Sequence, residues 1–517
     1  MANPTIPFPD DPYLPSTVEE AEAQHEVYAE NVQKFLDADG TRGYWRFFLD
    51  SYEGGRDWTE NYLIQYAREN ANDYANRKKR AAYYNYCGPI VQTYNEFLFQ
   101  SDPARSYGGK NAAKVEEWAG DVDGAGRSIG EYLAWAHVYA LVYGYVWLGV
   151  DAESDTSEDA VLSQADETER GREPYAVLLH PGQATNWLFD TFGKLIFLRI
   201  YEGRYEGAEG RCERFLTWTR RQWVRQEVWT KLDTASKADD VVRELITTDA
   251  AAHGLGRVPF AVYAGLASAK NPRLGASLIR DIGFQNRQLN QHVSALDEFL
   301  HKQCFAQLFL PEGTLPKGDT ASLGVNNAVE LPADAQHFPA YVAPDTSPAQ
   351  FLSQQIAWTV SEIYRAARLD NAAGSPTTTA PESGLSKAYD FERANRAFVS
   401  MAIRAERMER ELVTIYALWR GWEPEEVDYS ASYPRSFDVR GLAEQIESIL
   451  STQEIEGVPA SMIRAALKRV ADRMLPGLSP DEREEIVADI DAAENAGQEP
   501  GLPRRSDGEE SPETETG

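Results

Sequence analysis

A few ionisable residues have the type and spacing that could carry out chemistry. His292 and His301 share a predicted helix, and imidazoles on one helix face can bind a metal ion. Their nine-residue separation is about two and a half turns, so one ion cannot reach both. Glu409 and Glu411 form a carboxylate pair, but the alternating charges around them predict a solvated helix face. Neither pair predicts a catalytic or metal site.

Motifs for nucleotide or covalent chemistry are absent as well. The Gly193-Lys194 pair lacks the other residues of a phosphate-binding loop, and no dinucleotide fingerprint or nucleophile elbow occurs. The three cysteines (Cys87, Cys212 and Cys304) do not have zinc-site spacing. We therefore expect no cofactor, no metal and no enzymatic activity. A soluble acidic enzyme with an unrecognised site remains an alternative.

Composition narrows the class of protein. The chain has 517 residues, enough for more than one domain, and its net charge is −30. That charge argues against a general nucleic-acid binder, although it permits a protein past which DNA slides. Solubility or a salty habitat would explain it equally well. Residues 1–15 are not a signal peptide, which predicts synthesis in the cytoplasm. The apolar residues 131–150 predict a helix and a strand, not a membrane span.

The elements that could position a site change in character along the chain. Ser16-Thr17 predicts a helix start, residues 60–76 a helix, and the basic residues 77–80 its solvated end. Residues 145–263 predict an antiparallel β subdomain. Residues 274–301 and 349–369 both carry apolar stripes of helical period and enclose a small insert with predicted strands at 307–310 and 328–331. The first stripe is interleaved with amides, which suit a helix packed on several sides.

This order of elements resembles the portal protein of tailed bacteriophages, the ring-shaped head–tail connector through which DNA is packaged and ejected. Residues 143–147 (Tyr-Gly-Tyr-Val-Trp) are similar to the family's helix-to-strand entry into the wing. Residues 179–199 are similar to its wing hairpin, and residues 278–300 to its first stem helix. The resemblance covers residues 80–495 and rests on element order and these phrases.

The resemblance implies an α+β, mostly helical fold: a portal-like protomer with β-rich wing, two-helix stem, small α/β clip, long wing helix and helical crown. Its implied parts are an N-terminal arm and helices (1–80), wing (81–271), stem helix 1 (272–304), clip (305–347), stem helix 2 (348–369), tunnel loop (370–388), long wing helix (389–422), crown (423–497) and a disordered acidic tail (498–517).

The resemblance also implies a site and partners. The expected contacts between stem helices of neighbouring copies are Gln285, Asn286, Leu289, Val293, Leu296, Ile356 and Val360. The expected DNA-facing residues of the tunnel loop are Gly374, Ser375, Thr377, Thr378, Thr379, Ser383, Gly384 and Lys387, although a disordered linker would read the same way.

By the same resemblance, the chain forms a homo-oligomer, usually a dodecamer, in the virion at one capsid vertex. Its partners would be double-stranded DNA passing without tight binding, the large terminase subunit, a head-completion or adaptor protein, and capsid and scaffold proteins, with no membrane. Another capsid-associated ring or adaptor is the alternative within this class.

Overall fold

The computed structural model divides into two compact units, Met1–Phe437 and Asp438–Gly517. It describes residues 6–21, 44–152, 173–207, 210–232, 241–269, 272–303, 307–311, 328–331, 340–342, 345–369, 384–423, 426–435, 464, 467–468 and 486–491. In the second unit, the described residues include an ion pair of 2.8 Å between Lys468 and Asp491. Most of the predicted crown, and the acidic tail, lie outside the described residues.

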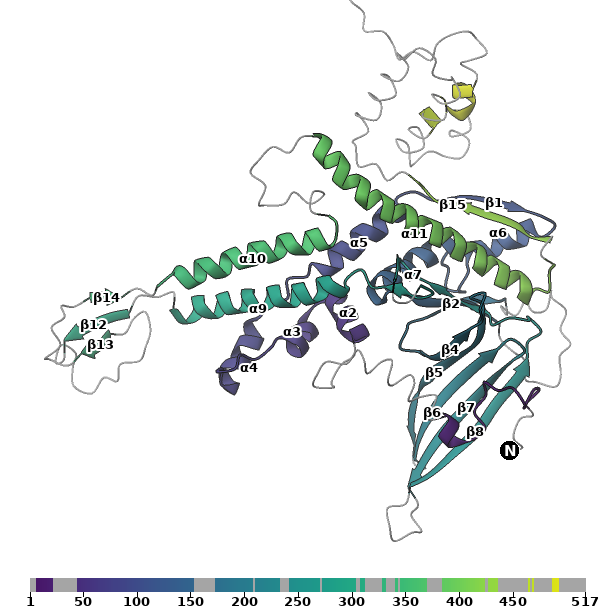
Figure 1. Ribbon diagram of the computed structural model, residues 1–517, viewed down its shortest axis with the longest axis horizontal. Helices are drawn as coiled ribbons and strands as arrows, with labels where there is room; N and C mark the ends of the chain where they lie inside the picture. Colours follow the sequence, from purple (N-terminus) through teal and green to yellow (C-terminus); the bar gives the residue numbers. More distant parts are fainter. Residues whose placement is uncertain are drawn as a thin grey trace, which may run out of the picture. The chain divides into compact units, whose positions relative to one another are not determined.

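Helices and mostly antiparallel strands make up the first unit (Figure 1), so the predicted α+β class is confirmed. The helices are α2 (Tyr44–Glu53), α3 (Arg56–Tyr62), α4 (Ala71–Arg80), α5 (Cys87–Leu98), α6 (Ala112–Gly120), α7 (Ile129–Tyr143), α9 (Arg280–Gln303), α10 (Ser347–Ala366) and α11 (Gly384–Trp419). The strands are β1 (Ala104–Gly108), β2 (Val146–Asp151), β3 (Tyr175–Leu179), β4 (Ala184–Phe189), β5 (Leu195–Gly207), β6 (Gly210–Thr219), β7 (Gln222–Leu232), β8 (Val241–Ala252), β9 (Phe260–Tyr263), β10 (Leu266–Ala267), β11 (Gly275–Ala276), β12 (Gln307–Pro311), β13 (Ala328–Leu331), β14 (Ala340–Val342) and β15 (Asp428–Ser432).

The junction of α7 and β2 shows how local sequence sets these elements. Ser128 and Glu131 form a reciprocal capping box that starts α7. Gly144 ends the helix at a φ of +98°, and a Cβ there would lie 2.8 Å from the Ser277 backbone nitrogen. The chain therefore turns directly into β2, as residues 131–150 predicted. Among the described helices, none is long and apolar enough to cross a membrane.

The predicted β subdomain is present as two antiparallel sheets. A five-stranded sheet has the order β4-β5-β6-β7-β8, and a three-stranded sheet has the order β3-β2-β9. Between them lies an apolar cluster that includes Trp147, Trp218 and Phe260. The central strand β2 is buried along almost its whole length as a result. The ribbon of β1 and β15 was not predicted as a pair, because its partners lie more than 300 residues apart.

Helix α11 runs through the main core. Phe398, Met401, Leu412 and Ile415 are fully buried, which matches the predicted stripe. The Trp419 indole nitrogen donates a hydrogen bond of 2.7 Å to the Val150 carbonyl oxygen and so ties the end of α11 to β2.

One predicted helix is wrong. Residues 60–76 are not continuous, because α3 ends at Tyr62 and α4 starts at Ala71. The side chain of Asn70 caps α4 by accepting a hydrogen bond from the Asp73 nitrogen. Local periodicity did not reveal this break, because the segment between the helices is fixed by contacts with α9 described below.

Candidate functional site: the helical hairpin and its flanks

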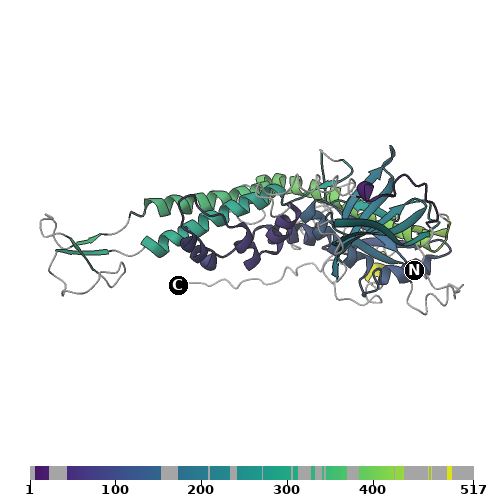
Figure 2. The same cartoon turned by 90° about the horizontal axis from the view of Figure 1, so that it is seen from below.

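Helices α9 and α10 lie side by side and form a helical hairpin (Figures 1 and 2). Ile282 and Leu289 of α9 and Ile363 of α10 are buried in the main core, with Ile356 and Val360 packed against it. The small sheet β13-β12-β14 joins the two helices in the chain. Its strands β12 and β13 match the two predicted strands of the insert, whereas β14 was missed.

The amides of α9 find partners inside the same chain. The Asn286 side chain is fully buried and donates a hydrogen bond of 2.5 Å to the Tyr83 hydroxyl. Asn290 accepts a hydrogen bond of 2.8 Å from the Tyr84 backbone nitrogen and donates to the Asn286 carbonyl oxygen. Residues 83–84 therefore supply hydrogen-bond partners for the Asn286 Nδ2 group and for Asn290 within the same chain, whereas the Asn286 Oδ1 atom has no partner among the described residues.

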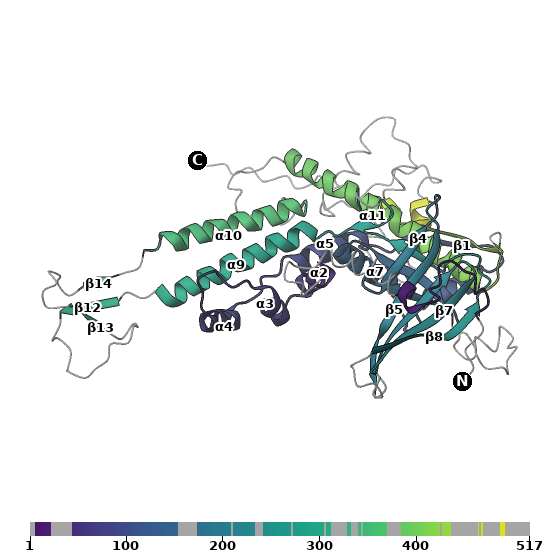
Figure 3. The same cartoon turned by 60° about the horizontal axis from the view of Figure 1, so that its bottom comes forward.

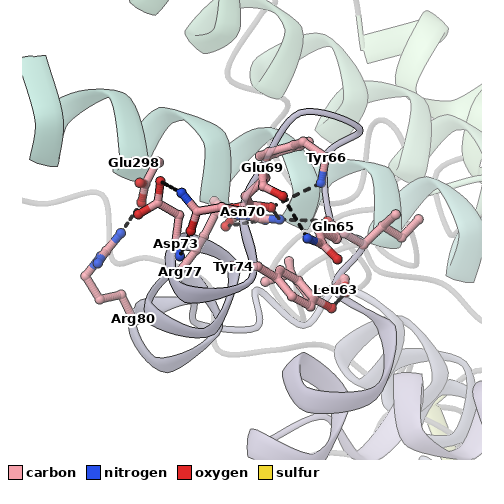
Figure 4. Close-up of polar contacts among 12 residues, drawn as sticks. Leu63, Gln65, Tyr66, Glu69, Asn70, Asp73, Tyr74, Arg77, Arg80 and Glu298 are labelled. Atoms are coloured by element: carbon pink, nitrogen blue, oxygen red, sulfur yellow. Dashed lines mark hydrogen bonds and ion pairs between the residues drawn. The ribbon is translucent and has the colours of Figure 1, made fainter.

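A buried ion pair holds the same side of α9 (Figure 4). The side chains of Arg77 and Glu69 are 1% and 7% exposed, and Arg77 also donates to the Ser294 hydroxyl of α9. Burial is the largest single influence and lowers the Arg77 pKa, but the hydrogen bonds that Arg77 donates to Glu69 and the electrostatic interactions with Glu69, Tyr66 and Tyr74 together raise it above its ordinary value. Arg80 pairs with Glu298. The prediction that residues 77–80 form a solvated helix end is thus wrong for Arg77, which fastens α4 to α9.

Helix α10 is covered on one side only within the described part of the chain. Its far side presents Phe351 and Trp358, which are 60% and 56% exposed. These residues are seven apart, so they share the helix face opposite Ile356 and Ile363. We call Phe351 and Trp358 the α10 flank. Large exposed aromatic side chains at the centre of a surface are typical of protein contacts.

A second apolar surface lies on the other side of α9. Ile64, Tyr66 and Tyr84 are 53%, 39% and 50% exposed, and we call them the α4 flank. The Tyr66 hydroxyl donates to the Gln291 carbonyl oxygen, while Arg77 lies 4.1 Å from the Tyr66 ring centre. Figure 3 shows α3 and α4 on the side of α9 that faces away from α10. The hairpin therefore exposes aromatic side chains on two opposite flanks.

The predicted stem contacts have different positions in the structure. Asn286 and Leu289 are 0% and 1% exposed, so neither offers surface to another copy in this conformation. Gln285, Val293, Leu296, Ile356 and Val360 are part-buried. Contact of these residues with a second copy stays a prediction. Sequence reasoning missed Phe351 and Trp358, although their seven-residue spacing opposite the apolar stripe was a visible signal.

Most of the predicted tunnel loop lies outside the described residues. Gly374, Ser375, Thr377, Thr378, Thr379 and Ser383 lie outside the described residues. Helix α11 begins at Gly384, five residues before the predicted start at residue 389, so Gly384 and Lys387 belong to a helix and not to a loop. A DNA-facing role for the eight residues stays a prediction.

The catalytic candidates are not assembled into a site. His301 is exposed and His292 part-buried, and the described residues contain no group of His, Cys, Asp and Glu side chains that could hold a metal ion. The prediction of a solvated Glu409 is wrong. Its buried carboxylate accepts hydrogen bonds from Tyr433, Tyr429 and Arg105, and the first of these is 2.7 Å long. Burial beside this carboxylate raises the Tyr433 pKa.

Comparison with known proteins gives limited results. No protein-family model and no curated protein matches the chain. One similar solved structure is described as the neck of a native GTA particle computed with C12 symmetry, with a TM-score of 0.38 and 13% identity over 74% of this chain and 89% of that chain. Another is the neck of an empty GTA particle computed with C6 symmetry, with a TM-score of 0.39 and 14% identity over 80% and 98%. Both TM-scores are below 0.5, so neither likeness establishes the family or the function of this chain.

Proposed function

We propose that this chain assembles head to tail into a closed ring through its helical hairpin and acts as a portal protein. The observation that carries the proposal is the pair of exposed aromatic flanks on opposite sides of α9. A contact between the α10 flank of one copy and the α4 flank of the next leaves a free flank at each end. Repetition of such a heterologous contact closes a ring when the rotation between neighbouring copies divides a full turn without a rise.

The conduit role follows from the charge and the element order. A ring of chains that each carry a net charge of −30 would repel phosphates, so duplex DNA could pass without tight binding. The large terminase subunit, a head-completion or adaptor protein, and the capsid and scaffold proteins would dock on this ring at one capsid vertex. The element order of the sequence, with a β-rich body and a two-helix stem, supports this role over that of an enzyme.

Two variants test the head-to-tail contact. Trp358→Asp places a charge on the α10 flank, and Ile64→Asp places one on the α4 flank. Each variant alone should remain monomeric by native mass spectrometry, because a buried unpaired charge is costly. An equal mixture should give dimers and no rings, because each mixed pair keeps one intact contact. Ile403→Asp is the matched control, since Ile403 is 45% exposed on α11 and belongs to neither flank.

Other outcomes would overturn the proposal. If either single variant formed rings, the flanks would not be the contact between copies. If the unmodified chain stayed monomeric at micromolar concentration, the protein would not form a ring. Electron microscopy then tests the conduit. A closed ring whose channel is too narrow for duplex DNA would favour a different capsid-associated ring or adaptor.

A further inference from the structure

The five-stranded sheet carries a built site for a segment of backbone, and that segment is the N-terminal arm, residues 6–21, which has turns at 8–11 and 11–14 and a helical turn at its end. In Figure 1 the arm, drawn in purple, lies beside β6, β7 and β8. The buried Gln222 side chain accepts a hydrogen bond of 2.8 Å from the Phe8 nitrogen and donates one of 2.6 Å to the Phe8 carbonyl oxygen. The Gln222 side-chain amide therefore forms hydrogen bonds with both the N–H and the C=O group of Phe8, as the backbone of a neighbouring strand would.

Further contacts of the same kind follow along the sheet. The buried Gln226 side chain donates to the Pro15 carbonyl oxygen at 3.0 Å. The Tyr13 and Phe197 rings stack with centres 5.0 Å apart. At the end of the arm, Ala21 is buried in a small apolar cluster with Phe215 and Val228. The sheet thus holds the arm at several places, by backbone groups and by apolar side chains.

These contacts do not depend on how the arm is joined to its sheet. Phe8 and Gln222 are 214 residues apart in sequence, and Gln226 and Pro15 are 211 apart. The 22 residues 22–43 connect the arm to α2, and an extended chain of that length spans at most about 75 Å. The same contacts are therefore available to the arm of an adjacent copy, at no loss of any bond described here.

We propose that in the assembled ring each five-stranded sheet holds the arm of a neighbouring copy. This inference rests on the proposed ring. An exchanged arm adds a second connection between copies that already meet through their helical hairpins. The two contacts then support each other, because the first raises the effective concentration for the second. The arm has four prolines, at 7, 9, 12 and 15, which restrict its backbone and lower the entropy lost when it docks.

Isotope-mixed photo-crosslinking tests the exchange in the full-length chain. Benzoylphenylalanine replaces Tyr13, and equal amounts of unlabelled and ¹⁵N-labelled chains are mixed before assembly. Illumination should join position 13 to the β5 peptide around Phe197. With exchange between random neighbours, about half of the crosslinked pairs should combine a light with a heavy peptide. The same label at Phe8, whose ring lies 3.7 Å from Arg221, provides a second position should the first disturb docking.

The outcomes separate the two proposals. Rings with only same-isotope crosslinks would overturn the exchange and leave the ring in place. Absence of any assembly would overturn both. Gln222→Ala should lower the crosslink yield about tenfold, since two hydrogen bonds are lost. The matched control Gln288→Ala removes an exposed amide of α9 and should leave the yield unchanged.

Discussion

Helices α9 and α10 carry the same apolar period, yet the rest of the chain covers them differently. Helix α9 has α10 on one side and α4 with residues 83–84 on the other, and its Asn286 and Asn290 side chains form hydrogen bonds within the chain. Helix α10 has a covered side and a side that exposes Phe351 and Trp358. Periodicity shows that one side of a helix is buried. The number of sides buried depends on which distant segments pack there.

Removing the buried cation beside α9 should have the largest effect. Arg77→Met leaves the Glu69 carboxylate buried without its partner and should lower the free energy of unfolding by about 3–5 kcal/mol. Urea unfolding measures the change. Arg80→Met is the control, because Arg80 is 31% exposed at a surface ion pair and should lose at most about 1 kcal/mol. Equal losses in the two variants would show that Arg77 does not fasten α4 to α9.

Shortening an apolar side chain should destabilise the protein much more on α9 than on the exposed side of α10. Leu289→Ala creates a cavity beneath α9 and should lower the free energy of unfolding by about 2–5 kcal/mol. Trp358→Ala should change it by less than about 0.5 kcal/mol, because that side chain is already exposed. Both are measured in the monomeric Ile64→Asp background, so that assembly does not contribute. A large loss for Trp358→Ala would mean that α10 is covered within the chain.

Acid should weaken the body of the chain without weakening the contact between flanks. Burial lowers the pKa of His137 to about 3, from 6.5 in the unfolded chain, and its Nδ1 lies 2.8 Å from the Tyr263 hydroxyl. The unfolded state therefore binds the extra proton. The contribution of neutral His137 to the free energy of unfolding is fully present above pH 6.5. It falls by up to about 1.4 kcal/mol per pH unit towards pH 3.

Unfolding followed across this range measures the slope, which should flatten in His137→Phe. Phe351, Trp358 and Ile64 carry no group that titrates there, so the affinity between flanks should stay constant. A slope unchanged by the substitution would assign the acid sensitivity to another group.

The smallest change in the free energy of unfolding should come from replacing a buried amide whose oxygen has no hydrogen-bond partner among the described residues. Gln285 Oε1 is buried and has no hydrogen-bond partner among the described residues, so Gln285→Leu should be neutral or stabilise by up to about 1 kcal/mol. Asn286→Leu should instead cost about 1 kcal/mol, because the Tyr83 hydroxyl loses the hydrogen bond that it accepts and keeps only the one that it donates to the Ser51 carbonyl oxygen. Thermal or urea unfolding distinguishes the two. A loss of similar size at Gln285 would place a bonding partner beside it.

Several parts of the fold could be predicted because their signals are local. The capping pair Ser128 and Glu131 and the turn at Gly144 set the α7–β2 junction, and Gly, Asp and charged turns marked the limits of the strands β3 to β8. The candidate site was harder. The stripes of α9 and α10 were visible, but nothing local indicated that Tyr83 would bond Asn286 across 203 residues.

The sequence by itself predicted the β subdomain and the stripes of α9 and α10, and it contains none of the common nucleotide and zinc motifs. Only the tertiary structure decided that Glu409 and Arg77 are buried in ion pairs, and that Phe351 and Trp358 are left exposed. The physical reason is that propensity and period act between neighbours in the chain. Burial of a charge, or exposure of an aromatic ring, depends on segments hundreds of residues away.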